Sequence, residues 1–349
     1  MPFDTVVAKT IEYLAVPSVV GHEGIFIEFL KQDFENLGIK VTEHKGVLEL
    51  NGKAPRSAII SAHIDRHGLI SMGGGDYAYA AEYIKENKYN VDGTPTQKML
   101  AAIGERFNGE KMYAYDPETG NKLGEGVISC TGPEIIKNNC IFEIDGMADL
   151  APDIPVAYAR SAVSDGAYLK GQIDNVVSLG VIYALYQNGF QGTALLSCEE
   201  EIGQSWRHIQ DWLEQSDIET KELIIIDTSP YRESAPIEAG MVVLRNRDKS
   251  GIFDTTLTEK IKQRCADKLM PFQCKDEYLI NLGTDINSLG STELGRIIQN
   301  ADNRWSGTTV QIPTTEYHTS YETTSRQSIE NYFALLQNIL INEPIISAF

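Results

Sequence analysis

Three consecutive carboxylates follow a short apolar run in the middle of the chain. Glu199, Glu200 and Glu201 come shortly after the run at residues 194–196. A buried carboxylate without a partner costs several kcal/mol or takes a proton, and a bound cation would remove that cost. An isolated acidic cluster more commonly faces water, so the triplet alone does not separate a metal site from a solvated turn.

Two further apolar runs also lead directly into residues of the types that bind metals. Residues 58–62 lead into His63 and Asp65, and residues 223–226 lead into Asp227. Compact apolar runs of this kind are typical of buried strands in parallel sheets. Ligands collect beyond the carboxyl ends of such strands. The three runs together therefore favour a metal site over a solvated turn.

Helical patterns between these runs predict the elements that position the residues. Asp174 opens a strongly apolar helical pattern, and residues 206–213 form another between the second and third runs. Strand, helix and strand therefore alternate, as in βαβ units. A last strand is expected at 309–312, ended by Pro313, with His318 in the loop beyond. Further helices are expected at residues 4–14, 23–37, 255–268 and 326–341.

The segment from residue 73 to 163 differs in texture from the rest of the chain. It is rich in turn signals such as Asn108-Gly109, and it contains short alternating runs such as residues 112–115. These features are typical of a small β-rich domain. We predict an α/β fold, a mixed sheet with helices on both faces, formed by residues 1–70 and 165–349, with the β-rich domain inserted at residues 71–164.

The composition limits the classes of partner and compartment. The 349 residues include 30 basic and 49 acidic side chains, a formal net charge of −19. Such a chain repels phosphate backbones, so we expect no nucleic-acid partner. We expect no membrane partner, because no apolar stretch approaches the about 20 residues that span a bilayer. The absence of signal-peptide features and the odd number of cysteines, five, favour a cytoplasmic protein.

The candidate metal ligands are imidazoles and carboxylates from distant parts of the chain: His63, Asp174, Glu200 or Glu201, Asp227 and His318. This mixture suits zinc, cobalt or manganese. Five ligands are too many for one tetrahedral ion with an open position. They suit two ions about 3.5–4 Å apart that share one carboxylate. A further carboxylate would then be free to act as a base.

The order of these motifs resembles that of the TET-type metallo-aminopeptidases, the glutamyl and deblocking aminopeptidase family. The chain has His-x-Asp after a strand, Asp at a helix start, a Glu-Glu-Ile-Gly turn, a strand-terminal Asp and a late Tyr-His-x-x-x-Glu. The resemblance extends over nearly the whole chain, including the inserted segment. It implies a zinc-exopeptidase-like catalytic domain with two divalent metal ions per subunit, zinc being favoured over cobalt or manganese.

The resemblance also implies how the ligands divide between the two ions. Asp174 would be the bridging carboxylate. His63 and Asp227 would complete one site, and Glu201 and His318 would complete the other.

Two more residues receive roles from the resemblance. Glu200 matches the general base that takes a proton from the nucleophilic, metal-bridging water, and Asp65 matches the partner that fixes the tautomer of His63. The register of the triplet stays open, because continued strand geometry would place Glu199 and Glu201 on one face. The following Ile202-Gly203 favours Glu200 and Glu201 in the metal site.

The resemblance implies an aminopeptidase that removes N-terminal residues from short peptides. It further implies a homo-oligomer, in which the inserted domain mediates dimerisation and dimers build a hollow dodecamer. Two alternatives stay open. One is a metal-independent glycoside hydrolase, because some relatives were labelled endoglucanases and glycosidases use a carboxylate pair. The other is a catalytically silent scaffold that binds peptides or metal.

The remaining histidines and the departures from the family pattern concern the surroundings of the site. Arg66-His67 stands where many relatives have an acidic residue followed by an aliphatic one. His67 and His22 are expected to be structural or to support a ligand, and His208 is expected at the surface. The departures leave the preferred N-terminal residue of the substrate open.

Overall fold

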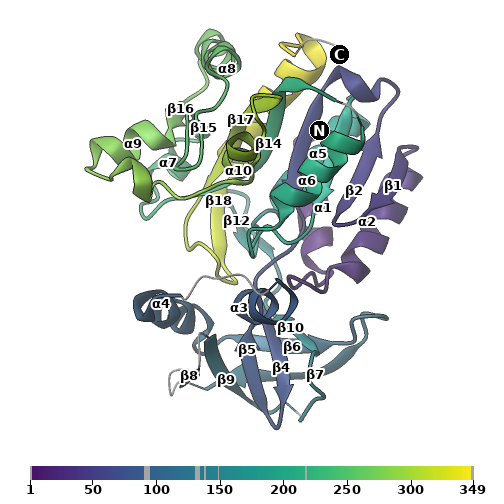
Figure 1. Cartoon of the computed structure of the whole chain (residues 1–349), viewed down its shortest axis with the longest axis vertical. Helices are drawn as coiled ribbons and strands as arrows, with labels where there is room; N and C mark the ends of the chain where they lie inside the picture. Colours follow the sequence, from purple (N-terminus) through teal and green to yellow (C-terminus); the bar gives the residue numbers. More distant parts are fainter. Residues whose placement is uncertain are drawn as a thin grey trace.

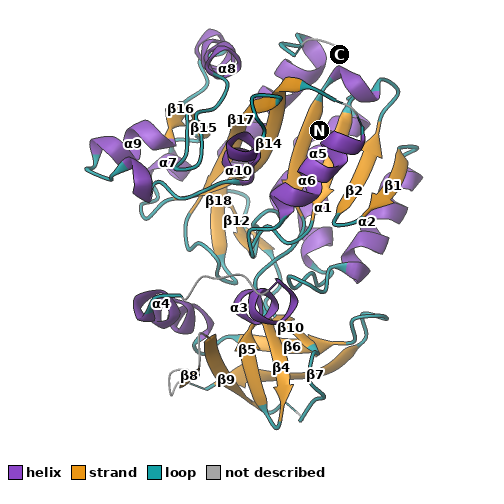
Figure 2. Ribbon diagram, in the orientation of Figure 1, coloured by secondary structure: helices purple, strands orange, loops and turns teal. Residues whose placement is uncertain are grey.

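The computed structural model describes residues 2–89, 95–129, 134–136, 139–147, 149–216 and 218–346. Figure 1 shows a large layered part that contains both termini and a smaller β-rich part beneath it. Figure 2 shows that helices flank the sheet of the large part, whereas strands dominate the small part. None of the described helices is long and apolar enough to cross a membrane.

An eight-stranded sheet forms the centre of the large part. Four neighbouring strands, β13, β3, β14 and β17, run parallel to one another, whereas β1 and β2 add to one edge in antiparallel pairings. The apolar runs of β3, β13 and β14 match the prediction of buried strands. The spatial order is β1 (Lys40–His44), β2 (Val47–Asn51), β13 (Thr193–Ser197), β3 (Ile59–His63), β14 (Thr220–Pro230), β17 (Trp305–Thr314), β15 (Val242–Arg245) and β16 (Phe272–Cys274).

Helices cover both faces of this sheet because both faces are apolar. Along β3, Ile60 belongs to the larger core on one face and Ile59 to a second core on the other. The larger core is covered by α1 (Pro2–Leu14), α2 (Gly24–Asn36), α5 (Val176–Gln187), α8 (Thr255–Asp267) and α11 (Arg326–Gln337), and the second by α6 (Ser205–Gln215) and α10 (Glu293–Asn300). The long apolar pattern after Asp174 fits α5, which packs between the sheet and α1.

The small part is a closed antiparallel barrel with its own core. Its first and sixth strands in the spatial order, β5 and β9, also pair with each other. The core includes Leu69, Tyr115 and Phe107, the last from α4 (Gln97–Phe107). The order is β5 (Asp76–Tyr79), β4 (Leu69–Gly73), β10 (Pro155–Tyr158), β6 (Lys111–Tyr115), β7 (Lys122–Ile128), β9 (Asn139–Asp145) and β8 (Glu134–Ile136), with α3 (Ala80–Ile84) following β5.

A third, three-stranded sheet packs against the large part, and Leu169 of its middle strand belongs to the larger core. It consists of β11 (Val163–Ser164), β12 (Tyr168–Gly171) and β18 (Glu322–Ser325). The remaining α-helices in the described part of the chain are α7 (Ala235–Glu238) and α9 (Lys275–Asn281). The predicted fold class is confirmed: a mixed sheet with helices on both faces and a small β-rich insertion. The domain boundaries at residues 70 and 165 stay a prediction.

Two predicted strand ends were wrong. β14 continues beyond Asp227, because its ladder with β17 extends to Pro230. β17 contains Pro313 and ends at Thr314, and it is not the last strand, since β18 follows. Pro313 is tolerated because the pairing of β17 with β15 ends at Gln311, so β17 has an open side there that needs no N–H donor.

Candidate metal centre

The parallel strands and α5 bring three of the predicted ligands together. His63 ends β3, Asp227 lies near the end of the neighbouring β14, and Asp174 lies just before α5. His63 Nε2 is 3.4 Å from Asp174 Oδ1 and 3.5 Å from Asp227 Oδ1. The side chains of His63 and Asp174 are only 4% and 5% exposed, so these charges lie out of water.

The other oxygen of Asp174 faces a second set of ligands. His318 Nε2 is 3.6 Å from Asp174 Oδ2 and 3.5 Å from Glu201 Oε2. His318 follows β17 with a positive φ of 62° in the loop before β18, and Glu201 lies in the turn after β13. Asp174 therefore stands between two imidazoles, with one carboxylate oxygen toward each.

These separations fit donors around shared cations better than they fit hydrogen bonds. Nitrogen and oxygen atoms 3.4–3.6 Å apart exceed the usual hydrogen-bond length. Around a tetrahedral cation with bonds of about 2.1 Å, neighbouring donors lie about 3.4 Å apart. Asp174 Oδ1 and His318 Nε2 are buried and make no hydrogen bond. The residues present therefore fit the coordination of divalent cations, and Asp174 offers one oxygen toward each imidazole.

The electrostatics of Asp174 agree with a charged, cation-binding carboxylate. Burial alone opposes its ionisation, but interactions with His318 and His63 outweigh burial and hold the pKa of Asp174 far below its usual range. The same contacts raise the pKa of His63 against the effect of its burial. The two imidazoles differ, because burial lowers the pKa of His318 to about 4. A metal ion between these groups would stabilise the Asp174 carboxylate more strongly than a neutral imidazole does.

The turn after β13 separates the three glutamates. The strand ends at Ser197, and Glu199 has a positive φ of 65°, so strand geometry does not continue through the triplet. The carboxylate of Glu199 accepts hydrogen bonds from His208 Nε2 at 2.8 Å and from the side chains of Lys88 and Tyr89. Glu199 and Glu201 therefore do not share one face toward the metal centre.

His208 was predicted at the surface, and this prediction was wrong. The residue is 8% exposed and lies on α6, where its ring meets Glu199. Although burial alone would raise it, the hydrogen bonds from His208, Lys88 and Tyr89 lower the pKa of Glu199 to about 2. Glu199 is consequently satisfied as an anion without a metal ion.

Asp65 holds the backbone of the other two glutamates. Its Oδ1 accepts a hydrogen bond from the backbone N–H of Glu200 and its Oδ2 one from that of Glu201, both at 2.9 Å. His63 Nδ1 donates a hydrogen bond to the backbone carbonyl oxygen of Asp65 at 3.1 Å, whereas the Asp65 carboxylate is 3.7 Å from this nitrogen. Asp65 therefore contacts His63 through its backbone and the acidic turn through its side chain.

Glu200 lies in the same electrostatic environment as the ligands. Burial raises the pKa of its carboxyl, His63 opposes this rise, and the carboxylate of Asp227 adds to it. A raised pKa makes the Glu200 carboxylate a better proton acceptor.

Glu322 connects two candidate ligands and received no role from the sequence. It is fully buried, and its carboxylate accepts hydrogen bonds from the backbone N–H of Asp174, at 2.8 Å, and from that of His318. The motif Tyr-His-x-x-x-Glu contained this residue, so its spacing from His318 was the available signal.

Two side chains from the barrel side of the molecule reach the same centre. Arg106, near the end of α4, places Nη1 3.2 Å from His318 Nδ1. His67, which precedes β4, places Nε2 2.7 Å from Glu201 Oε2. His67 was expected to be structural or to support a ligand, and it contacts the candidate ligand Glu201. No sequence signal pointed to Arg106.

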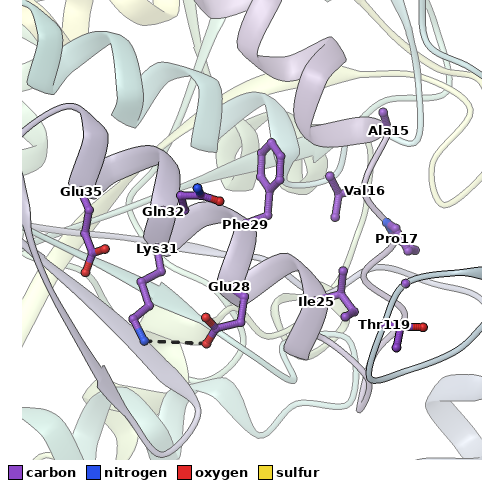
Figure 3. A pocket seen from close by; sticks show the side chains of 11 residues that line it. Ala15, Val16, Pro17, Ile25, Glu28, Phe29, Lys31, Gln32, Glu35 and Thr119 are labelled. Atoms are coloured by element: carbon purple, nitrogen blue, oxygen red, sulfur yellow. Dashed lines mark ion pairs between the residues drawn. The ribbon is translucent and has the colours of Figure 1, made fainter.

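The cleft in Figure 3 lies elsewhere and carries no comparable chemistry. It opens between the end of α1, α2 and the barrel loop at Thr119 and Gly120. Its charged pair, Lys31 and Glu28, is 3.7 Å apart and solvent-exposed. An exposed pair of this kind contributes little energy, so the buried centre at Asp174 is the stronger functional candidate.

Comparisons with known proteins identify a family and several solved structures that the chain resembles. Residues 158–335, just over half of the chain, match the M42 glutamyl aminopeptidase family. The search of curated proteins found no match. An aminopeptidase from the archaeon Desulfurococcus kamchatkensis has the same fold, with a TM-score of 0.73 at 13% identity over 97% of this chain and 95% of that one.

Two further solved structures share the fold over almost their whole length. A TET aminopeptidase from a marine sediment Thaumarchaeota archaeon has a TM-score of 0.72 at 15% identity, covering 97% of both chains. The TET1 peptidase of Pyrococcus horikoshii has a TM-score of 0.68 at 16% identity over 96% of this chain and 99% of that one. The chain belongs to the M42 glutamyl aminopeptidase family and is a peptidase.

Proposed function

We propose that this protein is a dinuclear metal-dependent aminopeptidase that removes N-terminal residues from short peptides. The observation that carries the proposal is the position of Asp174, whose two carboxylate oxygens face His63 and His318 separately. A single cation would not use donors on both sides of this carboxylate. Two cations that share it would use all of them.

The donors divide into two sets under this proposal. His63 and Asp227 hold one cation together with Asp174, and Glu201 and His318 hold the other. Imidazole and carboxylate donors suit zinc first, with cobalt and manganese as the other candidates. The family's dependence on metal supports the presence of the ions, and their number is part of the proposal.

The chain's own residues supply positioning and proton transfer. Two bound cations would lower the pKa of a water molecule and polarise the carbonyl of the scissile bond. Glu200 accepts the proton of that water and passes a proton to the leaving amine, which contributes about 10²–10⁴-fold in rate. Asp65 holds the backbone of Glu200 in place for this task.

We also propose that the chain works as a homo-oligomer. The Pyrococcus horikoshii TET1 peptidase can assemble into a tetrahedron or a large octahedral shell. In our proposal the inserted β-rich domain, residues 71–164, mediates dimerisation, and dimers build a hollow particle that admits short peptides. The four described cysteines are free thiols, which supports a cytoplasmic location.

Replacement of Glu200 by Gln tests the mechanism. The Glu200→Gln variant should lose hydrolysis of amino-acid anilides by at least about 10²-fold and keep its metal content in elemental analysis. Glu199→Gln is the matched control, since Glu199 is bound to His208, Lys88 and Tyr89, and it should stay active. Unchanged turnover of Glu200→Gln would remove Glu200 from this role, and loss in Glu199→Gln would shift the register of the triplet.

The same preparations discriminate the alternatives. A Thermotoga maritima protein described as an endoglucanase shares the fold with a TM-score of 0.64 at 13% identity, which does not decide activity. A glycosidase that needs only a carboxylate pair would keep its activity in a chelator, whereas the proposed peptidase should lose it. A silent scaffold would bind cobalt or zinc and release no amino acid from a peptide library.

A further inference from the structure

His67 places an additional imidazole at the second of the two proposed cation sites. One of its ring nitrogens, a carboxylate oxygen of Glu201 and a ring nitrogen of His318 all lie within 4.8 Å of one another. The rings of His67 and His318 have centroids 3.7 Å apart at an angle of 59°. His67 is 4% exposed, so no water shell satisfies its polar atoms.

The contact between His67 and Glu201 is close but is not a hydrogen bond. Nε2 of His67 lies 2.7 Å from Glu201 Oε2, yet this nitrogen has no hydrogen-bond partner of acceptable direction. Nε2 of His318 is likewise buried without one. Two imidazole nitrogens and one carboxylate oxygen therefore converge on a common space without satisfying one another.

We propose that His67 is a protein ligand of the second cation, in addition to Glu201, His318 and Asp174. This inference rests on the proposed dinuclear function and concerns a residue that the ligand set above does not include. The ligand is a divalent cation of the class that imidazole binds well, such as zinc or cobalt.

The surroundings of His67 hold its ring in the orientation that a ligand needs. Tyr79 Oη lies 2.5 Å from His67 Nδ1, and the two rings stack with centroids 5.6 Å apart. The backbone carbonyl of His67 accepts a hydrogen bond from Gln172 Nε2 at 2.8 Å. When Nδ1 carries the ring proton and donates a hydrogen bond to Tyr79 Oη, Nε2 has a free lone pair on the side of Glu201. A partner on the far nitrogen is the usual arrangement behind a metal-bound histidine.

The additional ligand changes the coordination that the second site favours. Four protein ligands would close a tetrahedral site, whereas a fifth position is needed for water or substrate. Donors at right angles around a cation with bonds of about 2.1 Å lie about 3.0 Å apart, closer to the 2.7 Å observed than a tetrahedral edge. The second site therefore favours a cation with five or six ligands, and its two imidazoles favour cobalt or zinc over manganese.

The test counts imidazoles around cobalt in the full-length protein. X-ray absorption of the wild type loaded with two cobalt ions should give about 1.5 imidazole nitrogens per ion, because three histidines would serve two ions. The His67→Phe variant should give about 1.0, and its second cobalt should bind at least about 100-fold more weakly in competition with a chelator. His22→Phe, which removes another largely buried histidine, is the matched control and should equal the wild type.

A second variant separates coordination from hydrogen bonding. His67→Gln keeps an N–H donor toward Glu201, so it should behave like His67→Phe if His67 binds the cation. Equal imidazole counts in wild type and His67→Phe, or full cobalt affinity in His67→Gln, would overturn the inference while two cobalt ions remain bound. A wild type that binds fewer than two ions would instead contradict the proposed function. Circular dichroism identifies a variant that has failed to fold, and the other variant then carries the test.

Discussion

Replacement of Asp65 by Asn should loosen the acidic turn and weaken cation binding. The Asp65 carboxylate accepts two backbone N–H groups at 2.9 Å, one on each oxygen. The isosteric amide has only one acceptor oxygen, so one of these N–H groups would face an NH₂ donor. A hydrogen bond to a charged acceptor contributes about 1.5–3 kcal/mol, and a tenfold change in affinity corresponds to about 1.4 kcal/mol.

The expected result is therefore a loss in cobalt affinity of about 10–100-fold, the range also found when residues behind metal ligands are replaced. Urea unfolding of the metal-free protein should show a free energy of unfolding lower by about 1.5–3 kcal/mol. Asp33→Asn is a matched control, because Asp33 also accepts from two groups, Lys9 and Tyr13, but joins α1 to α2 far from the turn.

The control should lose stability and keep its cobalt affinity. If Asp65→Asn changed neither quantity, or if Asp33→Asn weakened cobalt binding equally, the reasoning that Asp65 positions the turn would be refuted.

Four further predictions concern other parts of the molecule. Glu199→Gln should lower the free energy of unfolding at pH 7 by about 2 kcal/mol, after allowance for solvent screening of its half-exposed partner Lys88. Because the pKa of Glu199 is lowered to about 2, this contribution exists above about pH 4.5 and disappears as the pH falls toward 2. Urea unfolding should therefore show a large difference from wild type at pH 7 and a small one at pH 3. Asp254→Ala removes the cap that accepts from Leu257 N–H at 2.8 Å, and should cost about 1 kcal/mol in thermal unfolding without changing anilide hydrolysis. Chelation should lower the free energy of unfolding by about 4 kcal/mol for each cation that was present at about 1,000 times its dissociation constant, and an unchanged melting temperature would contradict this. Arg106→Met should raise the affinity for the second cation about tenfold in chelator competition, because the guanidinium repels a cation. The Arg106 guanidinium also contacts Nδ1 of His318, the nitrogen that must carry the proton when Nε2 binds metal. An unchanged affinity would argue that this contact does not compete with cation binding.

The strands that carry the ligands were predictable because both of their faces are covered. Along β3 and β13, neighbouring residues enter cores on opposite faces of the sheet, so the sequence shows continuous apolar runs. The residue after such a run lies at the carboxyl edge of the sheet, which placed His63 correctly at the end of β3. The same reasoning placed Asp227 just after the end of its strand, but Asp227 lies within β14. The strand continues through Thr228 and Ser229, whose polar side chains conceal the pairing with β17.

Contacts between the two parts of the chain were not predictable, because no local pattern encodes them. Lys88 and Tyr89 meet Glu199 across more than 100 positions of sequence. Ile202, in the acidic turn, packs with the core of the barrel. Arg106 reaches His318 from α4. Periodicity identifies a buried face, but it does not say which distant element covers that face.

The surroundings of the carboxylates distinguish Glu199 from Glu201, which the sequence did only through the following Ile202-Gly203. Glu199 meets three donors, so it stays ionised in a buried place without a cation. Glu201 meets imidazole nitrogens at 2.7 and 3.5 Å and neighbouring carboxylates, and its burial among them raises its pKa well above the usual range. Burying such a carboxylate is unfavourable unless it takes a proton or binds a cation. This contrast supports our proposal that Glu201, and not Glu199, binds a cation.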